Sequence, residues 1–148
     1  MGITMQNHGG YGEPYDNFYE GCYKIGRSYT DANQYLSLVH ESDKAVKNLI
    51  EYFSKVDDPV EIVFFGDHQP SLNSNFYPLL NGKGMSGLTE DELEALYTVP
   101  FFIWTNYDTP EETVDITSLN FLSTMTLERA GIELPAYNKF LADMMETV

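Results

Sequence analysis

The most constraining feature of this sequence is a run of large apolar residues that ends in glycine, a carboxylate and an imidazole. The run covers residues 62–65 (IVFF) and is followed by Gly66, Asp67 and His68. Four consecutive large apolar residues are typical of a strand buried on both faces, as in a parallel sheet covered by helices. Gly66 then allows the backbone to turn. Open α/β sheets bind ligands just past the carboxyl ends of their strands, where Asp67 and His68 are expected.

The Asp67–His68 pair has two interpretations. A carboxylate oxygen beside an imidazole nitrogen suits a divalent metal such as zinc or manganese. Alternatively, the pair only ends the strand, with Asp67 capping a backbone amide and His68 exposed to solvent. The residues themselves leave both interpretations open.

A second short strand is predicted at residues 2–7, where Ile3 and Met5 alternate with polar neighbours. It ends in a glycine-rich turn that carries His8. Parallel strands in one sheet would bring His8 to the same edge as Asp67 and His68. An ordinary loop histidine is the alternative.

The remaining segments alternate between helix and strand patterns. Asp31 is the expected N-cap of a long helix, and Thr89 with Glu92 forms a capping-box signature. The order strand, helix, strand, helix, strand, helix, helix predicts an α/β fold with a mostly parallel sheet flanked by helices. Three strands make a small sheet, so residues 1–148 are expected to be the carboxyl-terminal portion of a larger domain. The segments are a helix at 31–54, a helix from Thr89, a strand at 99–104 and helices at 118–130 and from Pro135.

Composition excludes several classes of function. The net charge is −15 with only eight Lys and Arg, which argues against nucleic acid and against an anionic membrane surface. The single cysteine, Cys22, excludes an intrachain disulfide and a cysteine-based zinc cluster. No apolar run approaches the roughly 18 residues of a membrane span, and we expect a soluble chain without a signal peptide. A Tyr-rich loop at 13–30 either shapes a substrate pocket or packs as a lid.

Several ordered motifs resemble the sulfatase-like family of lipoteichoic acid synthases, which belongs to the alkaline phosphatase superfamily. The resemblance covers nearly the whole chain. Its motifs are TMQNHGGY (4–11), QYLSL (34–38), ESDKA (41–45), FGDHQPSL (65–72), VPFFIWTNYD (99–108) and SLNFLS (118–123).

The resemblance implies a phosphate or sulfate ester as substrate, with phosphatidylglycerol as a lipid donor. In that family a metal-bound threonine attacks phosphorus, forms a glycerophosphoryl-enzyme and passes the group to a hydroxyl. By motif, Asp67 and His68 are implied metal ligands, while His8 and Gln69 are implied to bind substrate. The cofactor is expected to be manganese, with magnesium, calcium or zinc as alternatives. The parent is implied to be anchored in the bacterial cell membrane with its catalytic domain outside.

The chain also departs from the family pattern. Gln69 stands where the best-known synthases have tyrosine, which puts the identity of donor and acceptor in doubt. No segment matches the threonine nucleophile or the remaining acidic ligand, so we expect no catalytic nucleophile here and no activity from the chain alone. One alternative is a non-catalytic remnant or partner-binding module. Another is a small phosphoesterase that completes its metal site in a dimer. Self-association of the truncated sheet is expected in any case.

Overall fold

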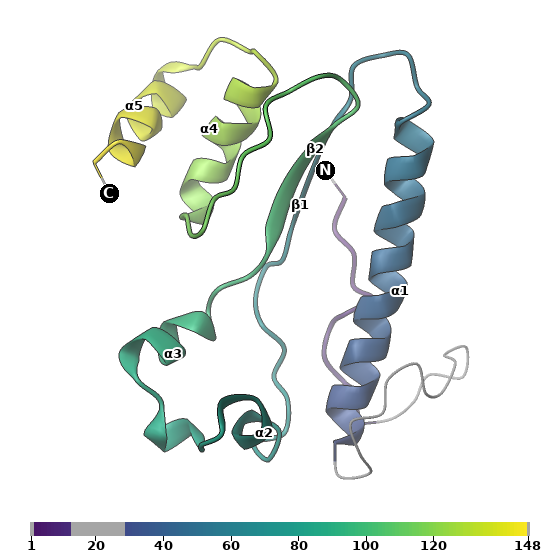
Figure 1. The fold of residues 1–148 in the computed structure, drawn as a ribbon, viewed down its shortest axis with the longest axis vertical. Coiled ribbons are helices and arrows are strands. Elements are labelled where there is room, and N and C mark those ends of the chain that lie inside the picture. Colours follow the sequence, from purple (N-terminus) through teal and green to yellow (C-terminus); the bar gives the residue numbers. More distant parts are fainter. Residues whose placement is uncertain (1, 13–28, 148) are drawn as a thin grey trace. The chain divides into compact units, whose positions relative to one another are not determined.

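The computed structural model describes residues 2–12 and 29–147. They form two compact units, Met1–Tyr52 with Gly66–Pro100, and Phe53–Phe65 with Phe101–Val148 (Figure 1). Residues 13–28, which hold most of the Tyr-rich loop and Cys22, lie outside the described residues.

The long helix α1 (Thr30–Phe53) dominates the first unit and confirms the helix predicted at 31–54. Its buried residues lie in its first half. Of its apolar residues farther along, Val39 and Leu49 expose 37% and 43% of their surface. Asp31 lies inside the first turn rather than capping it, and its Oδ1 accepts a hydrogen bond from the Ala32 amide at 2.9 Å.

The strand predicted at residues 2–7 is absent, and this prediction was wrong. The segment has irregular backbone with a turn at 6–7. It is attached to the unit by side chains instead: Ser42 Oγ donates to Asn7 Oδ1 at 3.0 Å, and the buried Tyr11 donates to the Asn7 carbonyl at 2.5 Å. A strand needs a neighbour to pair its backbone groups, and alternation in the sequence cannot supply one.

The segment between residues 69 and 100 contains three short helices, of which only the helix after Thr89 was predicted. They are α2 (Tyr77–Asn81), the 3₁₀ helix η1 (Met85–Gly87) and α3 (Glu90–Ala95). The capping box at α3 is confirmed, since Thr89 Oγ1 accepts from the Glu92 amide and a Glu92 carboxylate oxygen accepts from the Thr89 amide. Lys83 adds an ion pair to the same Glu92 carboxylate at 2.7 Å.

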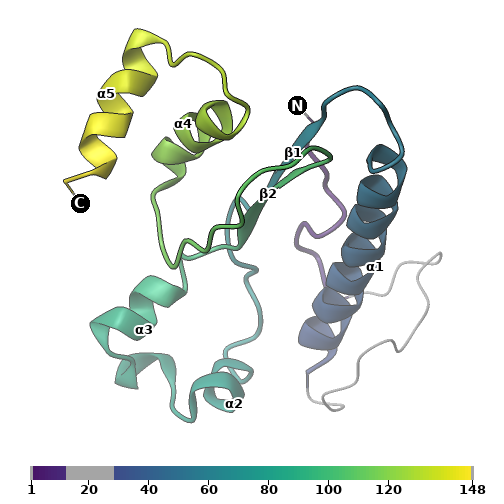
Figure 2. The same ribbon diagram turned by 45° about the horizontal axis from the view of Figure 1, so that its top comes forward.

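The second unit contains the sheet, which is a two-stranded ribbon of β1 (Glu61–Phe65) and β2 (Phe101–Thr105) (Figure 2). The strands are antiparallel, with Glu61 opposite Thr105 and Phe65 opposite Phe101. The parallel arrangement predicted from the apolar runs is therefore wrong for this pair. The predicted burial of β1 on both faces is also not seen, because Phe64 and Phe65 are exposed. Strand direction is set by the connection, which here is the helical segment through α2 and α3.

The remaining two helices, α4 (Leu119–Arg129) and α5 (Ala136–Met145), confirm the helices predicted there. Ser118 caps α4, and Gly131 follows it with the positive φ of 66° expected of a C′ residue. The helices pack through the buried Phe121, Leu122 and Leu141. Across them the Asn138 amide donates to Thr124 Oγ1 at 3.1 Å and to Ser123 Oγ at 3.2 Å.

One asparagine ties the turn before β1 to the end of β2. The Asn106 Nδ2 group donates to the carbonyls of Phe53, Val56 and Asp58 at 3.2, 2.9 and 2.9 Å. Its Oδ1 accepts from the Val60 amide at 2.7 Å. This side chain therefore fixes the chain path into β1. None of the helices in the described part of the chain is long and apolar enough to cross a bilayer.

Candidate functional site

The Asp67–His68 pair lies on an exposed bend directly after β1. The side chains of Asp67 and His68 expose 86% and 69% of their surface, and His68 Nε2 is 3.7 Å from Asp67 Oδ2. Asp67 Oδ1 accepts a hydrogen bond from the His68 amide at 2.9 Å. This is the capping bond expected if the pair only ends the strand. The two groups remain accessible at one point, as a metal or a charged substrate would require.

The hydrogen bonds of the His68 ring fix its tautomer. Nδ1 lies 2.9 Å from the Gln69 carbonyl oxygen. A carbonyl oxygen can only accept, so Nδ1 must carry the proton. In the neutral ring Nε2 then holds the free lone pair and lies on the side of the Asp67 carboxylate. Metal-binding histidines commonly use this arrangement, in which the second nitrogen donates to a carbonyl.

Gly66 is required by a close approach and not by a special backbone angle. Its φ is not positive. A Cβ placed on Gly66 would lie 3.1 Å from Val99 Cβ, and the Gly66 amide donates to the Pro100 carbonyl at 3.2 Å. Glycine therefore lets the chain leaving β1 pass against residues 99 and 100 and sets where the following bend begins.

Gln69, expected to bind substrate, has its side-chain amide donating to the backbone carbonyl of Thr98. This bond crosses from the bend to the segment that leads into β2. Its amide nitrogen is thus engaged within the unit, and the side chain serves at least to brace the bend that carries Asp67 and His68.

His8 lies on the exposed irregular segment after the turn at residues 6–7. Its amide donates to the Met5 carbonyl at 3.1 Å, and the neighbouring Asn7 is fixed to α1 through Ser42. The expectation that His8 reaches the sheet edge on a parallel strand therefore loses its structural basis. No group of three His, Cys, Asp or Glu side chains within residues 2–12 and 29–147 is arranged to hold a metal ion, so the structure does not gather His8 with the pair.

The two possible ligand groups at the bend are nevertheless of the types that divalent metals bind. Asp67 supplies an exposed carboxylate, and His68 supplies an exposed Nε2 with its tautomer set by Gln69. Zinc and manganese accept both types of ligand, and four or more ligands are usual. The pair is therefore suited to form part of a coordination shell.

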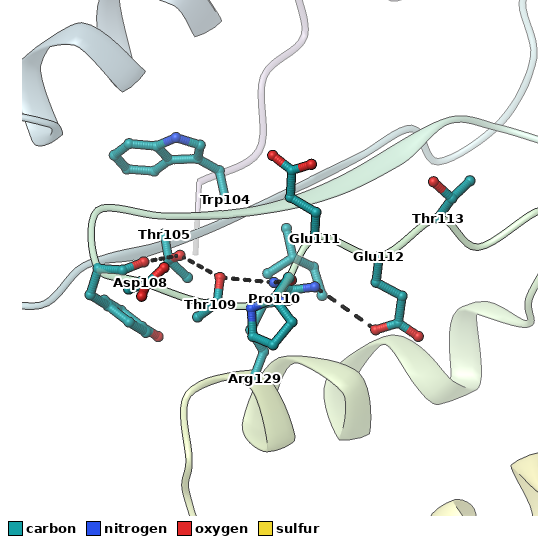
Figure 3. Close-up of a pocket in the computed structure, with 11 residues that line it drawn as sticks. Trp104, Thr105, Asp108, Thr109, Pro110, Glu111, Glu112, Thr113 and Arg129 are labelled. Atoms are coloured by element: carbon teal, nitrogen blue, oxygen red, sulfur yellow. Dashed lines mark hydrogen bonds and ion pairs between the residues drawn. The ribbon is translucent and has the colours of Figure 1, made fainter.

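The second unit contains a separate open pocket of about 680 Å³ (Figure 3). It lies beside the end of β2, along the loop Asp108–Thr113 and next to Arg129 at the end of α4. Arg129 Nη1 donates to Thr109 Oγ1 and to the Pro110 carbonyl, both at 2.9 Å. Sequence reasoning missed this pocket. A lone arginine in the last turn of a helix reads as a favourable helix-dipole residue, and nothing in the spacing links it to residues 105–113.

Burial raises the pKa of the Tyr107 phenol beside this pocket, and its hydrogen bond to the Glu61 carboxylate adds to the effect. The phenol donates to Glu61 Oε2 at 3.1 Å, while Glu61 Oε1 is buried with no hydrogen-bond partner among the described residues. The phenol is therefore held protonated as a donor to Glu61, which fixes the ring at the edge of the pocket.

Comparison with known proteins identifies the family. The sulfatase family model matches residues 1–132, and the chain belongs to the sulfatase family. Membership implies an α/β fold of the alkaline phosphatase type.

Two relatives come from Rhizobium meliloti (strain 1021). A protein named for cyclic beta-1,2-glucan modification is 29% identical over 154 residues, covering 97% of this chain and 24% of the relative. The capsular polysaccharide biosynthesis protein RkpI is 38% identical over 71 residues, covering 48% of this chain and 12% of the relative. The chain thus spans about a quarter of the first relative's length and about an eighth of the second. No solved structure gives a significant match.

Proposed function

We propose that residues 1–148 form the carboxyl-terminal portion of the catalytic domain of a metal-dependent, sulfatase-like phosphotransferase or hydrolase. Its substrates are phosphate or sulfate esters of the bacterial cell envelope. The observation that carries this proposal is the Asp67–His68 bend within a chain of the sulfatase family. An exposed carboxylate and an imidazole with a free Nε2 follow a strand at one point, with Gln69 fixing the tautomer.

In this proposal Asp67 and His68 are two ligands of a divalent metal, with manganese as the first candidate and magnesium, calcium and zinc as alternatives. The metal, when bound, lowers the pKa of the attacking hydroxyl and neutralises charge on the ester oxygens. Asp67 contributes negative charge, and the His68 ring is kept in one orientation by its Nδ1 proton. Gly66 keeps the bend close to Val99 so that both side chains stay at the strand end.

His8 and Gln69 are proposed to contact the ester group. The His8 ring is exposed, and its segment is attached to α1 through Asn7, which limits the region that the ring can reach. The attacking hydroxyl and the further acidic ligand are proposed to come from residues outside this chain. This arrangement explains why the bend offers two ligands when four or more are usual.

The proposed reaction is transfer of a phosphoglycerol group from a lipid such as phosphatidylglycerol to an envelope saccharide. The bond from phosphorus to the donor oxygen breaks, a bond to the acceptor oxygen forms, and the acceptor proton ends on the released alcohol. The resemblance to lipoteichoic acid synthases supports the donor, and the names of the two relatives support a glucan or capsular polysaccharide as acceptor. The parent is proposed to be membrane-anchored with this domain outside the cell.

The exposed apolar surface supports the proposal that the domain is larger than this chain. Large apolar side chains on β1 and on several helices are exposed, including Phe64 and Phe65 at 40% and 42%. The two-stranded sheet has two unpaired edges. Such surfaces in soluble proteins are normally covered by further structure or by a partner. Self-association through them is proposed for the isolated chain.

The test compares the 148-residue chain with the longer protein that the parent gene encodes. We expect the longer protein to turn over phosphatidylglycerol or a chromogenic phosphodiester with Mn²⁺, and His68→Ala to reduce the rate by about 10²-fold or more. His40→Ala, which removes a histidine of α1, is the matched control. The chain alone should show no turnover above its own His68→Ala variant.

Turnover by the 148-residue chain itself, abolished by His68→Ala, would replace this proposal with the small phosphoesterase assembled across a dimer. Absence of turnover by the longer protein with every divalent metal and ester tested would instead favour a non-catalytic module. The upstream gene sequence separates the same alternatives cheaply, because the proposal requires a threonine in a nucleophile motif there.

A further inference from the structure

We propose that the pocket beside β2 and α4 is a binding subsite for a neutral saccharide. The inference rests on the proposed function only for the choice of a glucan as its probe. The pocket measures about 680 Å³, within the range of about 300–1,000 Å³ common for small-molecule sites. It lies wholly in the second unit, whereas Asp67, His68 and Gln69 belong to the first.

The wall of the pocket is held in place by a chain of hydrogen bonds. Thr105 Oγ1 donates to the Tyr107 carbonyl at 2.9 Å and lies 3.0 Å from Thr109 Oγ1. Thr109 Oγ1 in turn accepts from Arg129, whose side chain is only 18% exposed. Figure 3 shows these groups joined from the strand end to the helix. A site fixed in this way loses little side-chain freedom when a ligand binds.

The charges of the pocket select against an anion. Three carboxylates, on Asp108, Glu111 and Glu112, line the pocket together with a single guanidinium, on Arg129. Both N–H groups of Nη1 are used by Thr109 and Pro110, and Nη2 lies 3.9 Å from Glu112 Oε2. A phosphate or sulfate would meet more negative than positive charge. The ester group is therefore expected to bind elsewhere.

The same carboxylates are poorly placed for a metal ion. Glu111 and Glu112 project to opposite sides of the loop, and Asp108 stands at the other end of it from Glu112 (Figure 3). Their oxygens are instead spread along the pocket, where each can accept a hydrogen bond from a different hydroxyl. The hydroxyl of Thr113 and the remaining Arg129 N–H groups can donate.

A neutral polyol fits this distribution of donors and acceptors. Each sugar hydroxyl both donates and accepts, so adjacent hydroxyls can pair with a carboxylate and with a threonine or arginine. Charge-assisted hydrogen bonds to carboxylates are also stronger than neutral ones. Trp104 projects from the other side of β2 in Figure 3, so the inference relies on the polar groups and not on ring stacking.

The experiment titrates the ¹⁵N-labelled 148-residue chain with sophorose, the β-1,2-linked glucose disaccharide, without added metal. We expect saturable amide shifts at residues 105–113 and 129. Asp108→Ala and Glu112→Ala should each weaken binding by about five-fold, the effect of losing one hydrogen bond. Glu146→Ala removes an exposed carboxylate at the C-cap of α5, and this variant should bind sophorose as tightly as the unsubstituted chain does. Circular dichroism checks that each variant is folded.

The proposal would be overturned if sophorose caused no saturable amide shift in the unsubstituted 148-residue chain, or if all variants bound it equally. Saturable shifts of the same amides with inorganic phosphate, strengthened in Glu112→Ala, would make the pocket an anion site and overturn it as well. Because no metal or turnover is involved, failure of saccharide binding leaves the ester-transfer proposal untouched. A longer protein without ester activity likewise leaves the saccharide result intact.

Discussion

The bend after β1 and the loop after β2 differ in how they are fixed. The side-chain hydrogen bonds of Asp67 and His68 themselves are local, joining residues one position apart, and both side chains remain exposed. The residues after β2 are held by partners far away in sequence, such as Asn106 with Phe53 and Arg129 with Thr109. The side chains suited to bind a metal therefore have only local partners, whereas those of Asn106 and Arg129 have distant ones, and Arg129 lies outside every quoted family motif.

The largest effect is expected from removing the side chain that fixes the turn before β1. Asn106→Ala loses the bonds to three carbonyls and leaves the Val60 amide without its acceptor. We expect unfolding free energy to fall by about 2–3 kcal/mol, the usual range for losing a partly buried network. Urea denaturation measures it. Asn120→Ala, on the exposed side of α4, should change stability by under about 0.5 kcal/mol.

If Asn106→Ala were as mild as its control, the loop after β2 would be no better fixed than the bend. The contrast between the two regions would then be one of exposure alone.

A smaller effect is expected in the bend itself. In Gly66→Ala the new Cβ meets Val99 at 3.1 Å, so Val99 must shift by a few tenths of an ångström. We expect a loss of about 1 kcal/mol, typical of mild overpacking. Gly84→Ala, where a Cβ meets nothing within 4 Å, is the matched control.

Combining Gly66→Ala with Val99→Ala tests whether contact with the Val99 side chain causes the loss of stability. If steric contact is the cause, Gly66→Ala should cost less in the Val99→Ala background than in the parent, as a double-mutant cycle shows. Equal costs in both backgrounds would mean that backbone freedom, and not the close approach, explains the glycine.

The smallest effect concerns a local ion pair. A hydrogen bond from Lys83 holds the pKa of Glu92 below its usual value, with the Thr89 amide adding to the shift. The folded state therefore binds this proton less tightly, so the stabilisation is complete above the unfolded pKa of about 4.3. It is lost as pH falls through the folded value.

Glu92→Gln keeps the capping geometry and removes the charge. We expect it to be slightly less stable than the parent at pH 7 and to converge with it at the acid end of a pH series of thermal melts. Glu94→Gln on the same helix is the control. A difference that persists unchanged in acid would assign the effect to capping and not to charge.

Much of the helical structure was predictable because its signals are local. The Thr89–Glu92 capping box, the Ser118 start of α4 and Gly131 after its end depend on neighbours within about one helical turn. The same holds for the Asp67–His68 bend, since Gly66 and the two polar residues are consecutive. The predicted N-cap, Asp31, was misplaced by two residues, a normal uncertainty at helix ends.

Features that depend on distant partners were not predictable. Residues 2–7 alternate like a strand but find no strand to pair with, and the two apolar runs pair in the antiparallel direction. The expected convergence of His8 with Asp67 and His68 relied on both points. Arg129 had no sequence signal as a pocket residue, because its partners lie 19 and 20 positions earlier.

The sequence by itself determined α1, α3, α4 and α5, the two strands and the carboxylate–imidazole bend, because each follows from spacing and backbone preference over a few residues. It also carried the sulfatase family motifs. Only the tertiary structure decided the direction of strand pairing, the role of Asn106 and the pocket at Arg129. Those depend on hydrogen bonds between segments about 20 to 50 residues apart, and the geometry of such closures is set by packing and not by local pattern.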